Sequence, residues 1–365
     1  MQKIIVVSAI NILEGGPLTI LNDCLSYLSD NLSSDYRIIA LVHEIKNIKA
    51  HNVECITYPR SRERWLYRLY YEYYQFKSFS REIKPFLWFS LHDITPNVDA
   101  TIRAVYCHNP SPFYSFSLNS LWYNYQVALF SLFYKYLYRF NIHKNDYVVV
   151  QQDWIRNAFQ KMYDLKKVIV AYPEERPVTM PAHHPEKFPK KTFLYPAFPR
   201  VFKNIEGVAE AARILHTQGR EDFQFLLTIN GTENRYASHI VGKYKNVPTI
   251  SFIGLKSREE IFHLYSQIDG LIFPSKLETW GLPISEFKTF GKPMFLADLP
   301  YAHETIGDFE KVVFFDPEKP QTLTRCIAKF LDDELEFTGN RRVEVNEPFA
   351  RNWKELFEIL LNPKS

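Results

Sequence analysis

Short apolar runs alternate along the chain with longer segments of helical periodicity. In the first half, five such runs are predicted to be strands: Lys3–Ile10, Tyr36–His43, Phe86–Leu91, Ala104–Cys107 and Tyr147–Gln151. A turn at Glu14–Pro17 and a helix from about Leu18 to Asn31 are predicted to follow the first strand. This alternation is typical of an α/β fold with a doubly wound parallel sheet, in which ligands bind beyond the carboxyl ends of the strands.

A second series of the same kind begins near residue 192. Its predicted strands are Thr192–Pro196, Phe223–Ile229, Thr249–Ile253, Gly270–Phe273 and Pro293–Ala297, and its predicted helices are Ile205–Thr217, Ser257–Ile268, Pro283–Phe290 and about Ala350–Leu361. Prolines and mixed charge between the two series predict a linker. We therefore expect an N-terminal domain over 1–172, a linker over 173–191, a C-terminal domain over 192–345 and a C-terminal helical segment over 346–365.

Composition narrows the functional classes. The 365 residues carry a net charge of only +3, so no overall field recruits nucleic acid. Four widely spaced cysteines favour neither a disulfide framework nor a zinc site and suit a reducing cytosol. The chain enters a strand at once and has no run of about 18 uncharged apolar residues, so we expect neither a signal peptide nor a membrane span. The expected location is the cytoplasm.

One run, Phe273–Glu286, carries the most specific chemistry. Glu278 and Glu286 stand eight positions apart, and a Gly-Leu-Pro elbow between them precedes a helix that Pro283 can start. The free amides of a helix start form an anion site. Carboxylates on both sides of that site could bind the hydroxyl groups that flank the phosphates of a sugar nucleotide. The alternative is that both are solvated surface charges, which is the usual fate of glutamate.

This run resembles the E-x7-E signature of retaining glycosyltransferases of the GT-B fold, family 4 in particular. The resemblance implies two Rossmann-like domains that face each other across a cleft, with the C-terminal helix crossing back to the first domain. It implies that Glu278 binds the donor sugar and Glu286 the ribose. The backbone of the elbow would then face the sugar and phosphates: Trp280, Gly281, Leu282 and Pro283.

The resemblance continues at a basic loop after the first strand of the second series. In Tyr195–Asn204, Lys203 matches the lysine of the family's G-R-L-x-x-x-K-G loop, which implies a contact with the donor phosphates. The family arginine is replaced by Phe198, and Arg200, two residues later, is the candidate to take its place. The backbone near Ile253 would lie against the nucleotide base.

Six residues of the first domain complete the expected site. Gly15 and Gly16 resemble the family's glycine pair after the first strand, where the missing side chain lets backbone approach a phosphate or an acceptor. His108 resembles the active-site histidine that contacts the donor sugar, and with Lys203 and Glu278 it makes up the expected catalytic set. Three more residues follow predicted strands and are acceptor-side candidates: His92, Asp93 and Asn109.

Two aromatic stretches of the first domain suggest a surface role. The segment from Arg60 to Lys84 has seven basic residues against three glutamates, and the segment from Phe113 to Phe140 has twelve aromatic residues and no acidic one. Aromatic and basic side chains together suit the headgroup layer of a membrane. The alternatives are that these aromatics pack into the core or, less well supported by the near-neutral charge, that they bind nucleic acid.

Taken together, the residues and the resemblance predict a retaining hexosyltransferase. It would move a sugar from a nucleotide sugar to a glycan acceptor, carried on a lipid, in the synthesis of a bacterial surface polysaccharide. No cofactor or metal is expected, and the enzyme would sit on the inner face of the plasma membrane. Two alternatives stay open: a sugar-nucleotide epimerase of the same fold, and a non-catalytic subunit that binds nucleotide sugars in an assembly complex.

Overall fold

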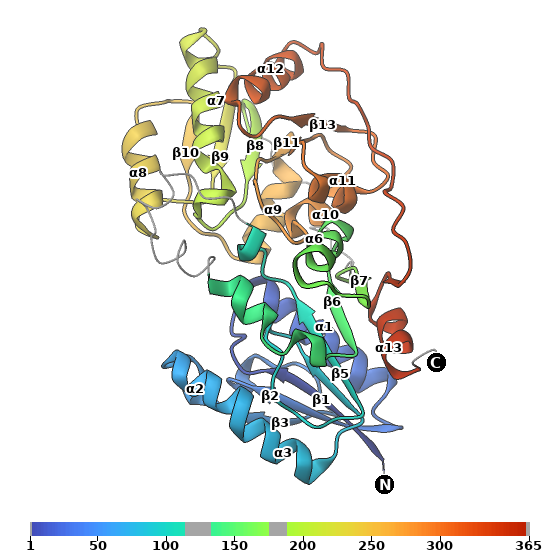
Figure 1. The fold of residues 1–365 in the computed structure, drawn as a ribbon. Helices are drawn as coiled ribbons and strands as arrows, with labels where there is room; N and C mark the ends of the chain where they lie inside the picture. The colour runs from blue at the N-terminus through green and yellow to red at the C-terminus, as the bar shows by residue number, and fades with distance from the viewer. Residues whose placement is uncertain (1, 114–132, 175–187, 363–365) are drawn as a thin grey trace. The chain divides into compact units, whose positions relative to one another are not determined.

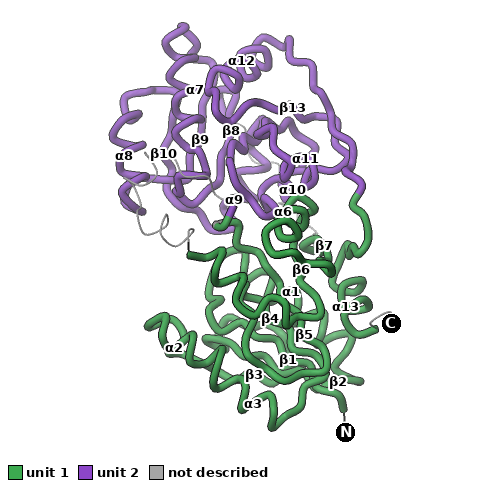
Figure 2. The backbone as a smooth tube through the Cα atoms, in the orientation of Figure 1, with its two compact units in different colours: residues 1–112, 130–174, 345–365 green, residues 113–129, 175–344 purple. Residues whose placement is uncertain are grey.

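The structure is a computed structural model that describes residues 2–113, 133–174 and 188–362 (Figure 1). It divides into two compact units (Figure 2). Unit 1 comprises the described parts of 1–112, 130–174 and 345–365, and unit 2 those of 113–129 and 175–344. Most of the predicted linker and of the aromatic stretch between Phe113 and Phe140 lies outside the described residues.

Unit 1 is built on one eight-stranded, wholly parallel sheet. Its strands are β1 (Lys3–Ala9), β2 (Tyr36–Val42), β3 (Glu54–Thr57), β4 (Leu87–Ser90), β5 (Ile102–Cys107), β6 (Tyr147–Val150), β7 (Val168–Ala171) and β14 (Phe349–Ala350). Their order is β14-β7-β6-β5-β4-β1-β2-β3, and every neighbouring pair is parallel. All five strands predicted in the first half are present within three residues, whereas β3, β7 and β14 were not predicted. β3 is short and largely polar and β14 has two residues, but β7 is a continuous apolar run, Val168–Ala171, that was missed.

Helices cover the unit 1 sheet and begin or end near its strands. They are α1 (Gly15–Asn31), α2 (Trp65–Tyr70), the π-helical turn η3 (Tyr71–Gln75), α3 (Phe76–Ile83), α6 (Asp153–Tyr163) and α13 (Trp353–Leu361), with short 3-10 turns η1 (Ile45–Asn47), η2 (Pro59–Arg62), η4 (Ser111–Phe113) and η5 (Ile142–Lys144). Helix α1 begins at Gly15, three residues before the predicted start, because Pro17 fits inside a first helical turn.

Alternate residues of strand β1 belong to two hydrophobic cores, one on each face of the sheet. Ile5, Val7 and Ala9 belong to the core that also contains residues of α1 and α13, while Val6 and Ile10 belong to a second core with Phe76 of α3. Successive side chains of a strand point to opposite faces, so burial of both faces demands an uninterrupted apolar run. This requirement explains the continuous Ile-Ile-Val-Val sequence of the strand.

The C-terminal segment is part of unit 1. β14 pairs with β7, and the Arg156 guanidinium of α6 donates to the carbonyl oxygens of Asn346 (2.8 Å) and Pro348 (3.2 Å). Helix α13 then packs on α1, where the rings of Phe357 and Tyr27 stack with 5.7 Å between centroids. Helix α13 thus completes the hydrophobic core that β1 and α1 form.

Unit 2 repeats the architecture with six parallel strands. They are β8 (Lys191–Tyr195), β9 (Phe223–Leu227), β10 (Ile250–Phe252), β11 (Gly270–Phe273), β12 (Met294–Ala297) and β13 (Val312–Phe315), in the order β10-β9-β8-β11-β12-β13. Its helices are α7 (Ile205–Thr217), α8 (Arg235–Tyr244), α9 (Arg258–Gln267), α10 (Leu282–Lys288), α11 (Pro300–Ile306) and α12 (Pro320–Leu331), with the 3-10 turn η6 (Val201–Lys203). Ser257 and Glu260 form a capping box at the start of α9, in which each side chain accepts from the other residue's backbone amide.

Both sheets reverse their strand order at one point. In unit 1 the chain's first strand, β1, lies between β2 and β4, and in unit 2 the first strand, β8, lies between β9 and β11. At such a point the loops that follow the two adjacent strands turn away in opposite directions and leave an opening for a ligand. A ligand is therefore expected near the loops that follow β1 and β4 in unit 1, and near those that follow β8 and β11 in unit 2.

We predict that Phe357→Ala destabilises unit 1 by about 3–5 kcal/mol, because it removes a fully buried ring that stacks on Tyr27. Urea unfolding followed by circular dichroism measures the loss. Glu358→Ala, at an exposed neighbouring position of the same helix, is the matched control. An equally small effect of both substitutions would mean that α13 does not contribute to the core.

Candidate functional site

Two loops at the reversal point of unit 2 meet through an ion pair. Lys203 ends the turn that follows β8, and Glu278 lies in the loop that follows β11. The lysine ammonium contacts Glu278 Oε1 directly, and the two side chains expose only 20% and 13% of their surface. β8 and β11 are neighbours in the sheet, so two residues 75 positions apart in sequence are brought together by strand order alone.

Backbone contacts hold these two loops in register. The Lys276 amide donates to the Phe202 carbonyl oxygen (2.8 Å), and the Tyr195 hydroxyl donates to the carbonyl oxygen of Lys203 (2.6 Å). The buried Asn204 side chain donates to the carbonyl oxygens of Pro274 (3.3 Å) and Pro317 (2.8 Å). The charged pair therefore stands on a fixed frame rather than on free loops.

The elbow after Glu278 is built as the sequence indicates. Gly281 has φ +95°, a left-handed conformation that favours glycine, and a Cβ there would lie 3.2 Å from Ile284 Cδ1. α10 begins at the next residue, with Pro283 in its first turn. Trp280 is buried, and the Thr305 hydroxyl of α11 donates to its carbonyl oxygen. The elbow is thereby anchored to the helix behind it.

Glu286 lies on α10 and faces an arginine of another helix. Its Oε1 is 3.1 Å from Arg258 Nη2 of α9. Burial raises the pKa of Glu286, and the guanidinium opposes this shift. A half-buried carboxylate whose charge is only partly offset is suited to accept hydrogen bonds from ligand hydroxyls.

Two other predicted donor residues lie at the same edge of the unit 2 sheet. Arg200 is exposed, and the Lys203 amide donates to its carbonyl oxygen (2.9 Å), so both basic residues belong to one turn. Its guanidinium carbon lies 6.0 Å from the ring centroids of Phe198 and Phe202. Ile253 directly follows β10, and its amide donates to the carbonyl oxygen of Leu227 (2.9 Å).

In unit 1, Gly15 and Gly16 form the first residues of α1, directly beyond β1. Gly15 has φ +70°, and only one atom of Pro17 would meet an added Cβ. Glycine is thus required here by backbone conformation and not by space. No acidic side chain stands in the first turn of this 17-residue helix, so its positive end is not offset there.

His108 and Asn109 follow β5 and are held by the carboxylate of Asp93. Asp93 Oδ1 accepts from the His108 amide (2.8 Å), the Asn109 amide (3.1 Å) and the Tyr138 hydroxyl (2.7 Å). Its Oδ2 accepts from the Tyr134 hydroxyl (3.2 Å). Asp93 is nearly fully buried, and these four contacts are all with its own neighbours; its acceptor-side role stays a prediction.

His92, the other acceptor-side candidate beyond β4, is buried as well. It is fully buried, and its Nδ1 accepts from Arg68 Nη2 (3.0 Å), because an arginine can only donate. Its Nε2 therefore carries the proton and lies 3.1 Å from Ser8 Oγ and 3.2 Å from Glu72 Oε1. Its role towards an acceptor stays a prediction.

Sequence reasoning missed the buried charges of this cluster. Arg68 and Glu72 lie on α2 and η3, and Arg68 Nε is 3.9 Å from Glu72 Oε1. Burial raises the pKa of Glu72 to about 8, and the Arg68 charge opposes the rise. In a basic-aromatic helix the two residues look like surface charges; the one available signal was their four-residue spacing in step with buried Phe76.

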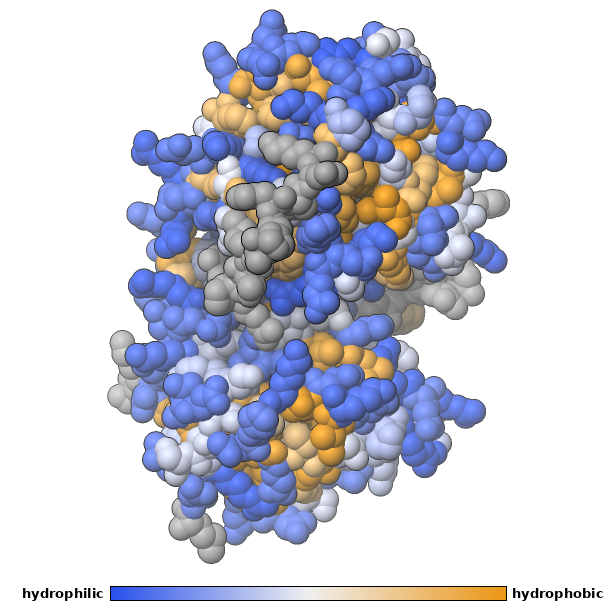
Figure 3. Space-filling model, turned by 180° about the vertical axis from the view of Figure 1, so that it is seen from behind, coloured by the Kyte–Doolittle hydropathy of each residue, from blue (hydrophilic) through white to orange (hydrophobic). Residues whose placement is uncertain are grey.

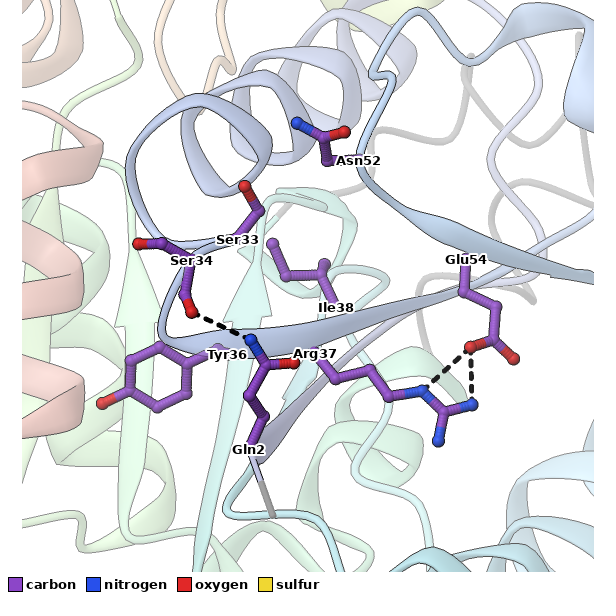
Figure 4. Close-up of a pocket in the computed structure, with 8 residues that line it drawn as sticks. All are labelled: Gln2, Ser33, Ser34, Tyr36, Arg37, Ile38, Asn52 and Glu54. Atoms are coloured by element: carbon purple, nitrogen blue, oxygen red, sulfur yellow. Dashed lines mark hydrogen bonds and ion pairs between the residues drawn. The ribbon is translucent and has the colours of Figure 1, made fainter.

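A shallow pocket lies at the opposite edge of the unit 1 sheet (Figure 4). It is lined by Gln2, Ser33, Ser34, Tyr36, Arg37, Ile38, Asn52 and Glu54. Gln2 donates to the Ser34 carbonyl oxygen (2.8 Å), and Arg37 Nε and Nη2 both donate to Glu54 Oε2 (3.0 and 2.6 Å). Because this is the amino end of parallel strands and its ion pair is solvent-exposed, we do not assign it to the site.

Comparisons with known proteins agree with this geometry. Residues 179–348 match the family model of glycosyl transferases group 1. The O-antigen chain mannosyltransferase B of Escherichia coli is 26% identical over 133 residues, which cover 36% of this chain and 34% of that protein. The chain thus matches about a third of the length of this curated relative.

Solved structures resemble nearly the whole chain. A lipopolysaccharide outer core galactosyltransferase has a TM-score of 0.61 at 12% identity, covering 92% of both chains. An Anabaena protein in complex with UDP-glucose has a TM-score of 0.60 at 14% identity, covering 90% of both. With the two parallel sheets, these likenesses confirm the predicted GT-B fold class; the cleft between the domains stays a prediction.

We predict that the stability gap between Glu72→Gln and the unchanged protein grows with pH. A carboxyl group whose pKa is raised on folding stabilises the folded state fully below its unfolded pKa, and this stabilisation is lost as pH rises towards about 8. Glutamine cannot ionise, so the variant should become more stable than the unchanged protein by a few kcal/mol at about pH 9. Urea unfolding from about pH 5 to about pH 9 measures the gap.

The exposed Glu82→Gln on α3 is the control and should show a constant difference across the same range. If Glu72→Gln instead destabilised the protein most at high pH, Glu72 would be ionised and paired with Arg68.

Proposed function

We propose that the protein is a retaining glycosyltransferase that moves a hexose from a nucleotide sugar to a glycan acceptor. The observation that carries the proposal is the Lys203–Glu278 pair at the reversal point of unit 2, followed by the elbow and Glu286. The match of residues 179–348 to glycosyl transferases group 1 supports transfer, and the mannosyltransferase relative supports polysaccharide synthesis.

The arrangement suits a donor that carries both hydroxyls and phosphates. Lys203 and Arg200 supply fixed positive charge for the leaving nucleoside diphosphate, whose negative charge grows in the transition state. Once phosphates bind Lys203, the Glu278 carboxylate is free to accept hydrogen bonds from the sugar. Glu286, one helix turn beyond the elbow, would bind the ribose.

The reaction needs no protein nucleophile in this proposal. The acceptor hydroxyl attacks on the face from which the nucleoside diphosphate leaves, and a donor phosphate oxygen takes its proton, so configuration is retained. Lys203, Arg200 and the backbone amides near Leu282 stabilise the departing phosphates. With these charges in place, we propose that no metal ion is required.

A surface of unit 1 supports an acceptor on a lipid carrier and contact with the inner face of the plasma membrane. Leu66, Tyr70 and Tyr74 recur every four residues along α2 and η3, so they form one stripe, and Leu66 and Tyr74 expose 73% and 74% of their surface. Arg60, Arg62 and Arg64, all exposed, precede this stripe. We call these six residues the aromatic-basic stripe.

The second aromatic stretch adjoins the stripe where it is described. The ring of Phe140 contacts that of Tyr73 (5.0 Å between centroids), and Phe133, Tyr136 and Phe140 are exposed. Elsewhere apolar residues lie exposed among hydrophilic ones on the face of each unit seen in Figure 3. Within the described residues, no helix has both the length and the apolar character of a membrane span. Binding would thus rest on the surface of the bilayer.

We predict that Glu286→Ala weakens nucleotide binding about tenfold or more, because each lost hydrogen bond to a charged group costs about 1.5–3 kcal/mol. Calorimetric titration of both proteins with UDP, GDP, dTDP and CMP measures the loss of affinity and identifies the base that the protein prefers. Glu278→Ala should keep the affinity for free nucleotide, since removal of its partner leaves Lys203 available, but should abolish most transfer.

The same assays separate the alternatives. Transfer to an acceptor that persists in EDTA supports a metal-independent transferase, whereas loss in EDTA and recovery with Mg²⁺ would contradict it. Donor turnover without an acceptor indicates an epimerase, and binding without turnover on any acceptor indicates a non-catalytic subunit. Equal effects of Glu278→Ala and Glu286→Ala would remove the roles proposed for both.

For the membrane, we predict that the protein sediments with anionic vesicles and that Leu66→Ser with Tyr74→Ser lowers the binding about tenfold, because apolar area is lost from the stripe. Vesicles of phosphatidylcholine with and without phosphatidylglycerol, at low and high salt, measure it. Met162→Ser, an exposed apolar residue of α6 outside the stripe, is the control. Unchanged binding of the double variant would show that the stripe is not the contact.

A further inference from the structure

Asp93 combines a left-handed backbone with a saturated carboxylate. It lies three residues after the end of β4, next to the reversal point of the unit 1 sheet, and has φ +71°, which is uncommon for a residue other than glycine. Backbone strain of this kind persists only where the surroundings over-determine the conformation. The surroundings here are four donors that converge on its two oxygens.

These donors fix the position of the carboxylate relative to the loop after β5. Two are backbone amides of His108 and Asn109, so Asp93 sets where that loop leaves the sheet. The other two are the hydroxyls of Tyr134 and Tyr138 on the helical segment 133–139. Burial and the Asp93 charge raise the pKa of both phenols, so they remain donors and hold the carboxylate from the far side.

The His108 ring meets this carboxylate with one nitrogen. Nε2 lies 3.9 Å from Asp93 Oδ2, and the imidazole exposes only 12% of its surface. A carboxylate opposite one ring nitrogen favours the proton on that nitrogen. Nδ1 then keeps its lone pair, and it is buried with no hydrogen-bond partner in the part of the chain that the structure describes.

We propose that Asp93 is a positioning residue that holds neutral His108 as the Nε2–H tautomer, so that Nδ1 accepts a hydrogen bond from a hydroxyl of the bound sugar. A buried acceptor without a partner costs free energy that a ligand hydroxyl recovers on binding. Asp93 touches no ligand itself. This inference rests on the proposed function, since it gives His108 a sugar hydroxyl as its partner.

The first test reads the tautomer without any ligand. In protein labelled with 15N-histidine, the resonances that disappear in His108→Gln identify this ring among the eleven histidines. The expected result is a protonated Nε2 and an unprotonated Nδ1. Asp93→Asn should produce a mixture of both tautomers, while Tyr134→Phe, which removes a donor but leaves the charge, should keep the single form.

The second test reads turnover. In a transfer assay with UDP-glucose and GDP-mannose as donors, Asp93→Asn should lower kcat at least about tenfold with a donor KM within about twofold, because binding is retained and orientation is lost. Tyr134→Phe should lower kcat less than about threefold. Urea unfolding followed by circular dichroism shows that unit 1 of each variant is folded.

The outcomes distinguish a failure of the positioning role of Asp93 from a failure of the proposed function. An Nδ1–H tautomer in the unchanged protein overturns the inference even if Asp93→Asn does not fold, and so does an active Asp93→Asn with unchanged kcat. If the unchanged protein shows the Nε2–H form but turns over no nucleotide sugar, the proposed function fails while the positioning by Asp93 stands.

Discussion

The reversal of strand order at β8 is the constraint on which the donor half of the site depends. The chain builds β8, β9 and β10 in one direction, then returns to place β11 on the other side of β8. The loops after β8 and β11 consequently begin side by side at one edge of the sheet. Lys203 and Glu278 meet there, and neither loop could place its charge without the other, because each uses backbone groups of its neighbour.

The two sheets use their reversal points differently. In unit 2 the charges at the reversal point remain partly exposed, namely the ammonium of Lys203 and the carboxylate of Glu278. In unit 1 the ionisable side chains of Arg68, Glu72 and His92 are buried and lie 3.0 to 3.9 Å from one another. A polar network in such surroundings adds rigidity and specificity more than stability. The loop that carries His108 and Asn109 is held separately, by the carboxylate of Asp93.

The sequence predicted the donor half better than the first domain for a physical reason. In unit 2 the informative features are local: a capping box, a glycine with positive φ, and a proline in a first turn each act within a few residues. β11 and α7 were accordingly predicted with their observed bounds. The Lys203–Glu278 contact depends on strand order and was not predicted; the resemblance assigned the two residues to one site without the contact between them.

In unit 1 the decisive features are burial and long-range contact, which a single sequence does not encode at any one position. Arg68 and Glu72 belong to a segment whose composition indicates a solvated or membrane-facing helix, and that indication is correct for Leu66, Tyr70 and Tyr74 one face away. The same helix therefore presents apolar residues to solvent and charged residues to the interior. Burying charged groups costs free energy unless they are paired, and large exposed apolar surfaces usually mark a binding site for a partner. The buried polar network and the aromatic-basic stripe of unit 1 thus both involve the helical segment of α2 and η3. In this segment the usual distribution of buried apolar and exposed polar side chains is reversed.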